Sequence, residues 1–222
     1  MKLNKVSGFT LIEVLVSMAI LVFGLLGIAG LMVKGQRASY EAYQRQQALT
    51  LAQDMVERMR SNPAGAASYV AVGAGEGSNM GHGTQAFPVD CDGTVCSADQ
   101  LAAFDLTKWD QLLTGSSESL GGNKVGGILN ARGCIEQVGA LNRYTVSVAW
   151  QGDATTVGPG DGGIAAGQAP VVACKDVDGV TNVATSTCGA GLYKDATGAV
   201  NNKNRRMVSL CLSTLQAVAG GS

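Results

Sequence analysis

Residues 7–13, Ser-Gly-Phe-Thr-Leu-Ile-Glu, open an apolar run that reaches Val33 and contains no charged residue except Glu13. The run from Phe9 to Val33 contains 25 residues. At about 1.5 Å per residue a helix of this length spans about 37 Å, which is enough to cross a bilayer core of about 30 Å. The sequence therefore predicts a membrane-spanning helix at the start of the chain.

The flanks of this run differ from those of a cleaved secretory signal. The apolar stretch is too long, and residues 29–33 offer no good small-x-small cleavage site. Lys2 and Lys5 precede the run and favour a cytoplasmic N-terminus, although Lys34 and Arg37 on the other side reduce the asymmetry. We expect the rest of the chain to lie outside the inner membrane.

The composition narrows the function classes. The chain has 222 residues and a net charge of -1, so binding to nucleic acid has no electrostatic support. Charged residues make up 15% and there are 31 glycines, which favours a modest core with β structure and loops beyond the first helix. His82 is the only histidine, and the Ser, His and Asp residues are too scattered to suggest a catalytic triad. We expect neither an enzyme nor a cofactor or metal site.

The helical pattern continues beyond the apolar run. Pro63 disfavours helix in the residue before it, so the helix is expected to end near Asn62. One helix from Phe9 to about Ser61 would be roughly 80 Å long. An apolar face recurs at three- and four-residue steps in its second half, at Ala38, Ala42, Leu49, Ala52, Val56 and Met59.

The remaining residues predict an α+β head. A short helix is expected over 97–114, and three stretches have the alternation or composition of strands: 133–138, 143–150 and 206–212. The Gly-, Asp- and Asn-rich stretches at 151–168 and 176–205 are expected to be long loops. The predicted fold is a long N-terminal helix packed on a small antiparallel sheet.

Six cysteines all follow the apolar run. Their even number in a loop-rich domain beyond a membrane segment indicates an oxidising compartment and up to three disulfides, with a metal site as the alternative. Six cysteines allow 15 pairings, which the sequence alone does not distinguish. A preference for two local loops and one strand-to-strand bridge gives Cys91–Cys96, Cys174–Cys188 and Cys134–Cys211.

The segment Ser7-Gly8-Phe9-Thr10-Leu11-Ile12-Glu13, with its basic leader and apolar run, resembles the signal of type IV prepilins and of type II secretion pseudopilins. The resemblance implies cleavage after Gly8 by a prepilin peptidase, N-methylation of Phe9, and a role in subunit assembly for Glu13. It also implies four parts: a leader (1–8), a membrane or filament-core helix (9–33), the soluble half of that helix (34–62) and a head (63–222).

Glu13 has two interpretations. Burying a carboxylate in the membrane near the start of a spanning helix costs a few kcal/mol or more. The side chain therefore either remains hydrated at the membrane interface or pairs with a polar partner. Cleavage after Gly8 would create a positive amine on Phe9. When subunits pack side by side, Glu13 of one subunit can pair with this amine on its neighbour. Removing either group leaves the other charge buried without an ion-pair partner.

Within the pilins, four stretches are similar to the PilV family of minor pilins, the type IV pilus modification proteins: 24–27, 53–63, 144–150 and 205–210. The resemblance implies a minor pilin in a tip or priming complex, located in the inner membrane with its head in the periplasm and then in the pilus at the cell surface. Implied partners are other minor pilins, the major pilin, the prepilin peptidase, the inner-membrane assembly platform and a PilY-type tip adhesin.

Three alternatives remain open. An I-type pseudopilin of type II secretion would have the same N-terminus, usually with a smaller head. A major pilin typically has one C-terminal disulfide loop rather than six cysteines. An enzyme or receptor anchored by one helix would not explain Gly8, Phe9 and Glu13 together.

Overall fold

A computed structural model describes most of the chain. The described residues are 8–70, 80–82, 89–116, 119–121, 123–124, 126–138, 142–152, 171–175, 181–194, 197–199 and 204–214. The chain divides into two compact units, Met1–Ala42 and Tyr43–Ser222. Each unit is described by itself, and the second is called the head unit.

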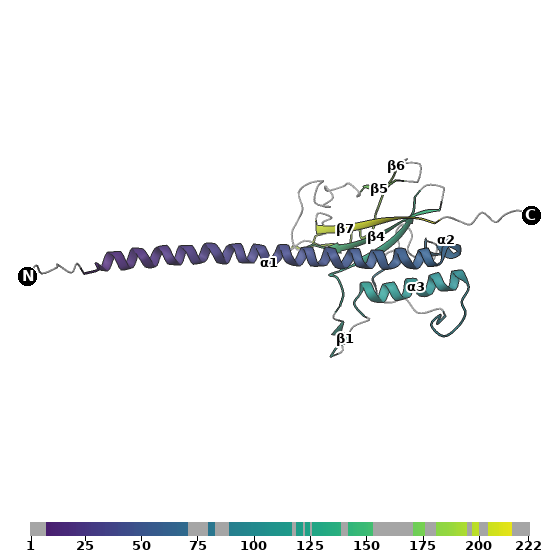
Figure 1. The fold of residues 1–222 in the computed structure, drawn as a ribbon, viewed down its shortest axis with the longest axis horizontal. Coiled ribbons are helices and arrows are strands. Elements are labelled where there is room, and N and C mark those ends of the chain that lie inside the picture. Colours follow the sequence, from purple (N-terminus) through teal and green to yellow (C-terminus); the bar gives the residue numbers. More distant parts are fainter. Residues whose placement is uncertain are drawn as a thin grey trace, which may run out of the picture. The chain divides into compact units, whose positions relative to one another are not determined.

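The predicted N-terminal helix is present as α1, Leu11–Ser61 (Figure 1). It starts two residues later than expected, where the carbonyl of Thr10 accepts hydrogen bonds from the backbone N–H groups of Glu13 (3.1 Å) and Val14 (3.4 Å). It ends where expected, because Asn62 leaves the helix directly before Pro63 and a short 3-10 turn, η1, runs over Pro63–Gly65.

In the head unit, α1 contributes one buried stripe to the core. Its buried residues are Gln44, Ala48, Ala52, Met55, Val56 and Met59. The predicted apolar face was right for Ala52, Val56 and Met59 and wrong for Ala38 and Ala42, which are exposed in the first unit. Short alanines match the helical period without burying enough surface to decide which side faces a core.

The second predicted helix is α3, Ala98–Leu113. A capping box starts it: the Ser97 hydroxyl accepts from the Gln100 backbone N–H, and the Gln100 side chain accepts from the Ser97 backbone N–H. Trp109 is fully buried and its indole N–H donates to the carbonyl of Leu51 over 3.0 Å. This bond attaches α3 to α1 within the head unit.

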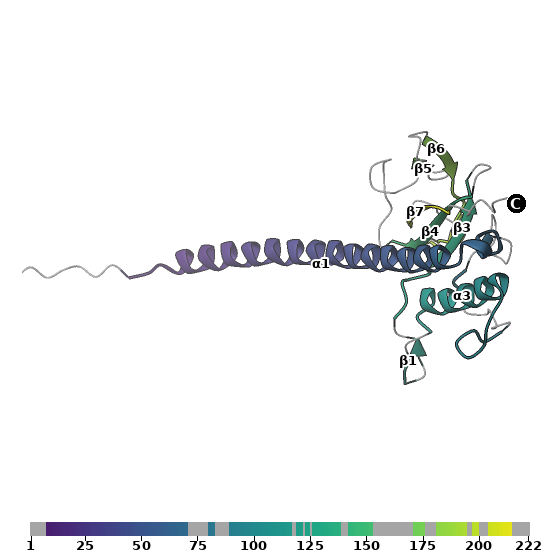
Figure 2. The ribbon, with the colours of Figure 1, turned by 45° about the vertical axis from the view of Figure 1, so that its right-hand side comes forward.

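The three predicted strands form one antiparallel sheet. The strands β3 (Arg132–Gln137), β4 (Arg143–Gln151) and β7 (Arg205–Ser213) pair in the order β3-β4-β7. Figures 1 and 2 show the sheet and α3 on different sides of the C-terminal half of α1. Ile135 and Val146 are register partners and share the core with α1 and α3, so the sheet packs its apolar face on the helices.

Short elements complete the described structure. They are α2 (Ala66–Tyr69), the pair β1 (Ser119–Leu120) and β2 (Asn123–Lys124), and the pair β5 (Val171–Lys175) and β6 (Thr181–Thr185). The prediction of one long loop over 176–205 was wrong, because β6 lies within it and pairs antiparallel with β5. Five residues between turn-forming stretches gave too short an alternation to indicate a strand.

The disulfide pairing expected from the sequence needs correction. Cys91 pairs with Cys96, as expected. Cys134 pairs with Cys188, so the expected bridges Cys134–Cys211 and Cys174–Cys188 were both wrong. The described cysteines are disulfide-bonded, including Cys211, which argues against the alternative of a metal site. The side chain of Cys174 lies outside the described part of the structure.

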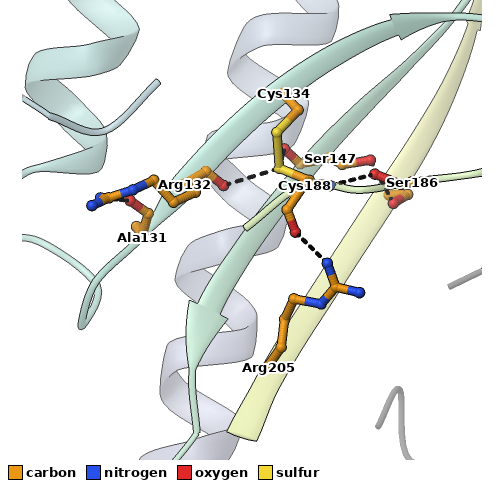
Figure 3. The surroundings of a disulfide bond; sticks show 8 residues. Ala131, Arg132, Cys134, Ser147, Ser186, Cys188 and Arg205 are labelled. Carbon is orange, nitrogen blue, oxygen red and sulfur yellow. Dashed lines mark hydrogen bonds between the residues drawn. A yellow bond between two sulfur atoms is a disulfide. The ribbon is translucent and has the colours of Figure 1, made fainter. Parts of the chain in front are cut away.

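The sheet explains why Cys134 does not reach Cys211. Cys134 is on β3 and Cys211 is on β7, with β4 between them. Two strand spacings amount to roughly 9.5 Å, which exceeds the Cα separation of about 7 Å that a disulfide can bridge. Cys134 instead faces the segment before Tyr193, where Cys188 lies close to the sheet and its carbonyl accepts from Arg205 over 2.9 Å (Figure 3).

Non-reducing peptide mapping of the purified protein is expected to recover Cys91–Cys96 and Cys134–Cys188. Because these bridges use four of the six cysteines, we expect Cys211 to be found with Cys174. No free thiol should react with an alkylating reagent before reduction. Recovery of a Cys134–Cys211 peptide, or stoichiometric zinc with reactive thiols, would contradict this pairing.

A buried polar cluster joins α1, α2 and α3 in the head unit. Asp105 is 6% exposed; its carboxylate accepts from the Arg58 guanidinium over 3.0 Å and from the Tyr69 hydroxyl over 2.6 Å. Burial raises the pKa of Tyr69 above its usual range, and the hydrogen bond to Asp105 acts in the same direction. Asn62 donates to the carbonyl of Ala98 over 2.8 Å and thereby joins the end of α1 to the start of α3.

Asp105→Ala is expected to lower the free energy of unfolding by about 2 kcal/mol, because the buried Tyr69 hydroxyl loses its acceptor and the half-buried Arg58 keeps only its pair with Asp54. Asp92→Ala is the control, since Asp92 forms an ion pair with Lys108 over 3.2 Å and its side chain is 69% exposed. Exposed pairs contribute about 0–1 kcal/mol. Thermal and denaturant unfolding of the solubilised protein measure both. Equal destabilisation by the two variants would contradict the role given to the cluster.

Candidate processing and assembly site

The segment that carries the predicted cleavage site is exposed and precedes the helix. Gly8, Phe9 and Thr10 have no regular secondary structure, and the side chain of Phe9 is 80% exposed. A Cβ added at Gly8 would meet no heavy atom within 4 Å. The described part of the chain therefore imposes no need for glycine at this position, and any such need comes from a partner that binds the segment.

Glu13 lies in the first turn of α1 and is exposed. Its backbone carbonyl accepts from the hydroxyl of Ser17 over 2.6 Å. An acid in the first turn is favourable next to the partial positive charge of a helix N-terminus. Among the described residues its carboxylate has no ion-pair partner, so its charge is available to another molecule.

The apolar part of α1 and the residues directly before it are exposed in the first unit. Phe9, Leu11, Phe23 and Leu31 are each 73–80% exposed. An 18-residue window of the helix has a mean hydropathy of 2.6 and none of it is buried, so by length and composition α1 is able to cross a membrane. A Cβ at any of Gly24, Gly27 and Gly30 would meet open space. Such a surface requires a lipid or protein environment.

The structure brings the sequence-predicted residues into two groups. Gly8, Phe9 and Glu13 lie together at the start of α1, whereas the cysteines with described side chains lie in the head unit. Sequence reasoning missed Arg205, which is only 2% exposed, and burial lowers its pKa. The strand alternation places Arg205 on the same face as Met207 and Ser209, opposite the face that packs on the helices, so no sequence signal indicated its burial.

Two family models match consecutive parts of the chain. Residues 3–29 match a model described as the prokaryotic N-terminal methylation motif. Residues 30–107 match a model described as type IV pilin Tt1218. These matches and the fold support a type IV pilin. The second match reaches into α3, so the likeness to a type IV pilin extends beyond the N-terminal helix.

Comparisons with curated proteins and with solved structures gave no significant match. The type IV pilin family is structural rather than enzymatic, which is consistent with the sequence-based prediction for this chain. The apolar N-terminal helix and the methylation motif fit a pilin that is anchored in a membrane before it enters a pilus. The match to the methylation motif includes Gly8, Phe9 and Glu13, the residues that the sequence predicts for processing and assembly.

Proposed function

We propose that this type IV pilin is a minor pilin of the PilV type that is processed at Gly8–Phe9 and joins other minor pilins in a complex that primes pilus assembly at the tip. The observation that carries the proposal is the match of residues 3–29 to the methylation motif, together with the exposure of residues 8–10 directly before α1. An exposed, non-helical segment is accessible to a peptidase, whereas a helix would first have to unwind.

Processing at this peptide bond has three chemical consequences. It removes the basic leader 1–8, it creates an amine on Phe9, and it leaves Glu13 as the nearest acid, four residues further along. The prepilin peptidase and the methylation of Phe9 belong to this proposal. The amine of one subunit then pairs with Glu13 of its neighbour, and the pair fixes the axial register of the helices in the filament core.

The proposed parts follow from this processing. Residues 9–33 are the membrane and filament-core helix, 34–62 are the soluble half of the helix, and 63–222 are the head. The disulfides Cys91–Cys96 and Cys134–Cys188 support a periplasmic head, because disulfides persist in oxidising compartments. The inner-membrane assembly platform, the major pilin and a PilY-type tip adhesin are the proposed partners.

Quantitative mass spectrometry of sheared pili tests the minor-pilin role. The protein is expected in the pilus fraction at far below the amount of the major pilin, and its deletion is expected to reduce the number of pili. Cross-linking should join it to other minor pilins. An amount equal to that of the main subunit would identify a major pilin instead, and association only with a secretion apparatus would identify a pseudopilin.

A further inference from the structure

The two disulfides of the head unit differ in how their cysteines follow one another along the chain. Cys91 and Cys96 are neighbouring cysteines with a sequence separation of 5. Cys134 and Cys188 have a separation of 54, and Cys174 lies between them in the sequence. The second bridge passes over a cysteine, so the native pairing is not the one that joins each cysteine to the next.

The elements that place Cys188 beside Cys134 come later in the chain than both cysteines. The buried cluster around this bridge includes Tyr193, and Met207 of β7 packs against it. The carbonyl of Cys188 accepts a hydrogen bond from Arg205, the first residue of β7 (Figure 3). Because synthesis and export begin at the N-terminal end, every cysteine up to Cys188 is exported before β7. The contacts that select the native partner of Cys188 are then still missing.

Oxidation of the unfolded head favours other pairs. The entropic cost of closing a loop grows with its length, so Cys188 meets Cys174, 14 residues away, roughly eightfold more often than it meets Cys134. Cys174 is also the first cysteine that follows Cys134. A bond from Cys174 to either of these cysteines prevents the native bridge between them from forming.

We propose that this chain is a substrate of a periplasmic thiol–disulfide isomerase, which exchanges the bonds of Cys174 before the head folds. This inference rests on the periplasmic head of the proposed function. A dithiol oxidase first forms the bonds and takes up two electrons and two protons for each of them. The isomerase then acts with no net oxidation, because it consumes two disulfides and forms two others.

The exchange can be written for the pattern that joins each cysteine to the next. The isomerase thiolate attacks Cys174 in its bond to Cys134, which leaves as a thiolate. The Cys134 thiolate attacks Cys188 in its bond to Cys211, forms Cys134–Cys188 and releases the Cys211 thiolate. This thiolate attacks Cys174 in the mixed disulfide, which forms Cys174–Cys211 and regenerates the isomerase thiolate.

The burial of the native bridge sets the order of the steps. Cys134 is 3% exposed and Cys188 is 1% exposed in the folded head unit, so an isomerase does not reach this bond once the head has folded. Exchange therefore comes after the first oxidation and before the segment around Tyr193 closes over the sheet. Incorporation into a pilus follows these steps.

Peptide mapping of the protein from cells with and without the periplasmic isomerase tests the proposal. Without the isomerase, the wild type is expected to carry Cys174 bonded to Cys134 or Cys188, with at least about fivefold less of the native Cys134–Cys188 bridge. Cys91–Cys96 should form in both strains, because its cysteines are neighbours.

The double variant Cys174→Ser, Cys211→Ser is the matched control. In this variant each remaining cysteine has the next one as its native partner, so Cys134–Cys188 is expected to form equally with and without the isomerase. A trap covers the case in which the double variant does not fold. An isomerase that lacks its second active-site cysteine retains mixed disulfides, and it should be recovered bonded to the wild-type chain at a cysteine within 134–211.

The possible failures separate the two proposals. Equal amounts of Cys134–Cys188 in the wild type from both strains, or recovery of the trap without this chain, would overturn the need for an isomerase and leave the proposed function standing. If all six cysteines are reduced in cells that contain both the oxidase and the isomerase, the periplasmic head of the proposed function is wrong as well.

Discussion

Gly8→Val is expected to leave an uncleaved precursor in the membrane. A side chain at Gly8 would meet open space in the protein itself, so the variant should fold and insert as the wild type does. The branched valine would instead obstruct the peptidase at the bond that precedes Phe9. Intact-mass measurement of membrane extracts should show the full chain with residues 1–8 retained, and sheared pili should lack the protein.

Gly24→Val provides a matched control for this experiment. Gly24 lies within the apolar run 9–33 and, like Gly8, is open within 4 Å, but it is far along the chain from the proposed cleavage site. Its substitution should leave cleavage after Gly8 intact. Normal processing of Gly8→Val, or equal loss of processing in both variants, would show that Gly8 is not the position that the peptidase reads.

Glu13→Gln is expected to leave insertion and cleavage intact and to reduce incorporation into pili by at least about tenfold. Removing one partner of a buried ion pair costs about 3–5 kcal/mol, since the remaining charge, here the Phe9 amine of a neighbour, stays buried without compensation. Insertion should be no worse, because a charge has left an apolar segment. The measurement is the amount of the protein in sheared pili relative to its amount in membranes.

Glu57→Gln is the control for this substitution. Glu57 also lies on α1 and pairs with Arg60 over 2.6 Å, but its side chain is 68% exposed and such a pair contributes little. Equal incorporation of Glu13→Gln and wild type at equal membrane levels would make Glu13 an interfacial residue. A subunit at the extreme tip is the exception, because no neighbour lies above it, so cross-linking should first establish its position in the minor-pilin complex.

The parts of the fold that the sequence predicted well depend on local signals. Pro63 disfavours helix in the residue before it, so the C-terminal end of α1 could be predicted from the sequence. The capping box of Ser97 and Gln100 spans only four residues and marks the start of α3. The alternation in β4 persists over nine residues that are mostly buried, which made this strand the clearest of the sheet.

The parts that the sequence did not predict depend on contacts between distant segments. Cys134 pairs with Cys188 across 54 residues, and nothing local to either cysteine distinguishes this partner from the others. The sequence around Asp105 is that of an exposed acid on a helix surface. Its burial depends on the hydrogen bonds from Arg58 and Tyr69, which form only in the folded head unit. The proposed processing site, by contrast, lies in a short linear motif, and residues 3–29 match the N-terminal methylation motif.

Intact-mass spectrometry of the protein recovered from sheared pili tests the proposed processing and assembly most directly. It examines processing, methylation and incorporation in one sample. The expected mass is that of a chain that lacks residues 1–8, begins at Phe9 and carries one N-methyl group. Recovery of the protein only from membranes with its leader intact, in cells with active prepilin peptidase, would contradict the proposal, as would a chain cleaved near Ala29.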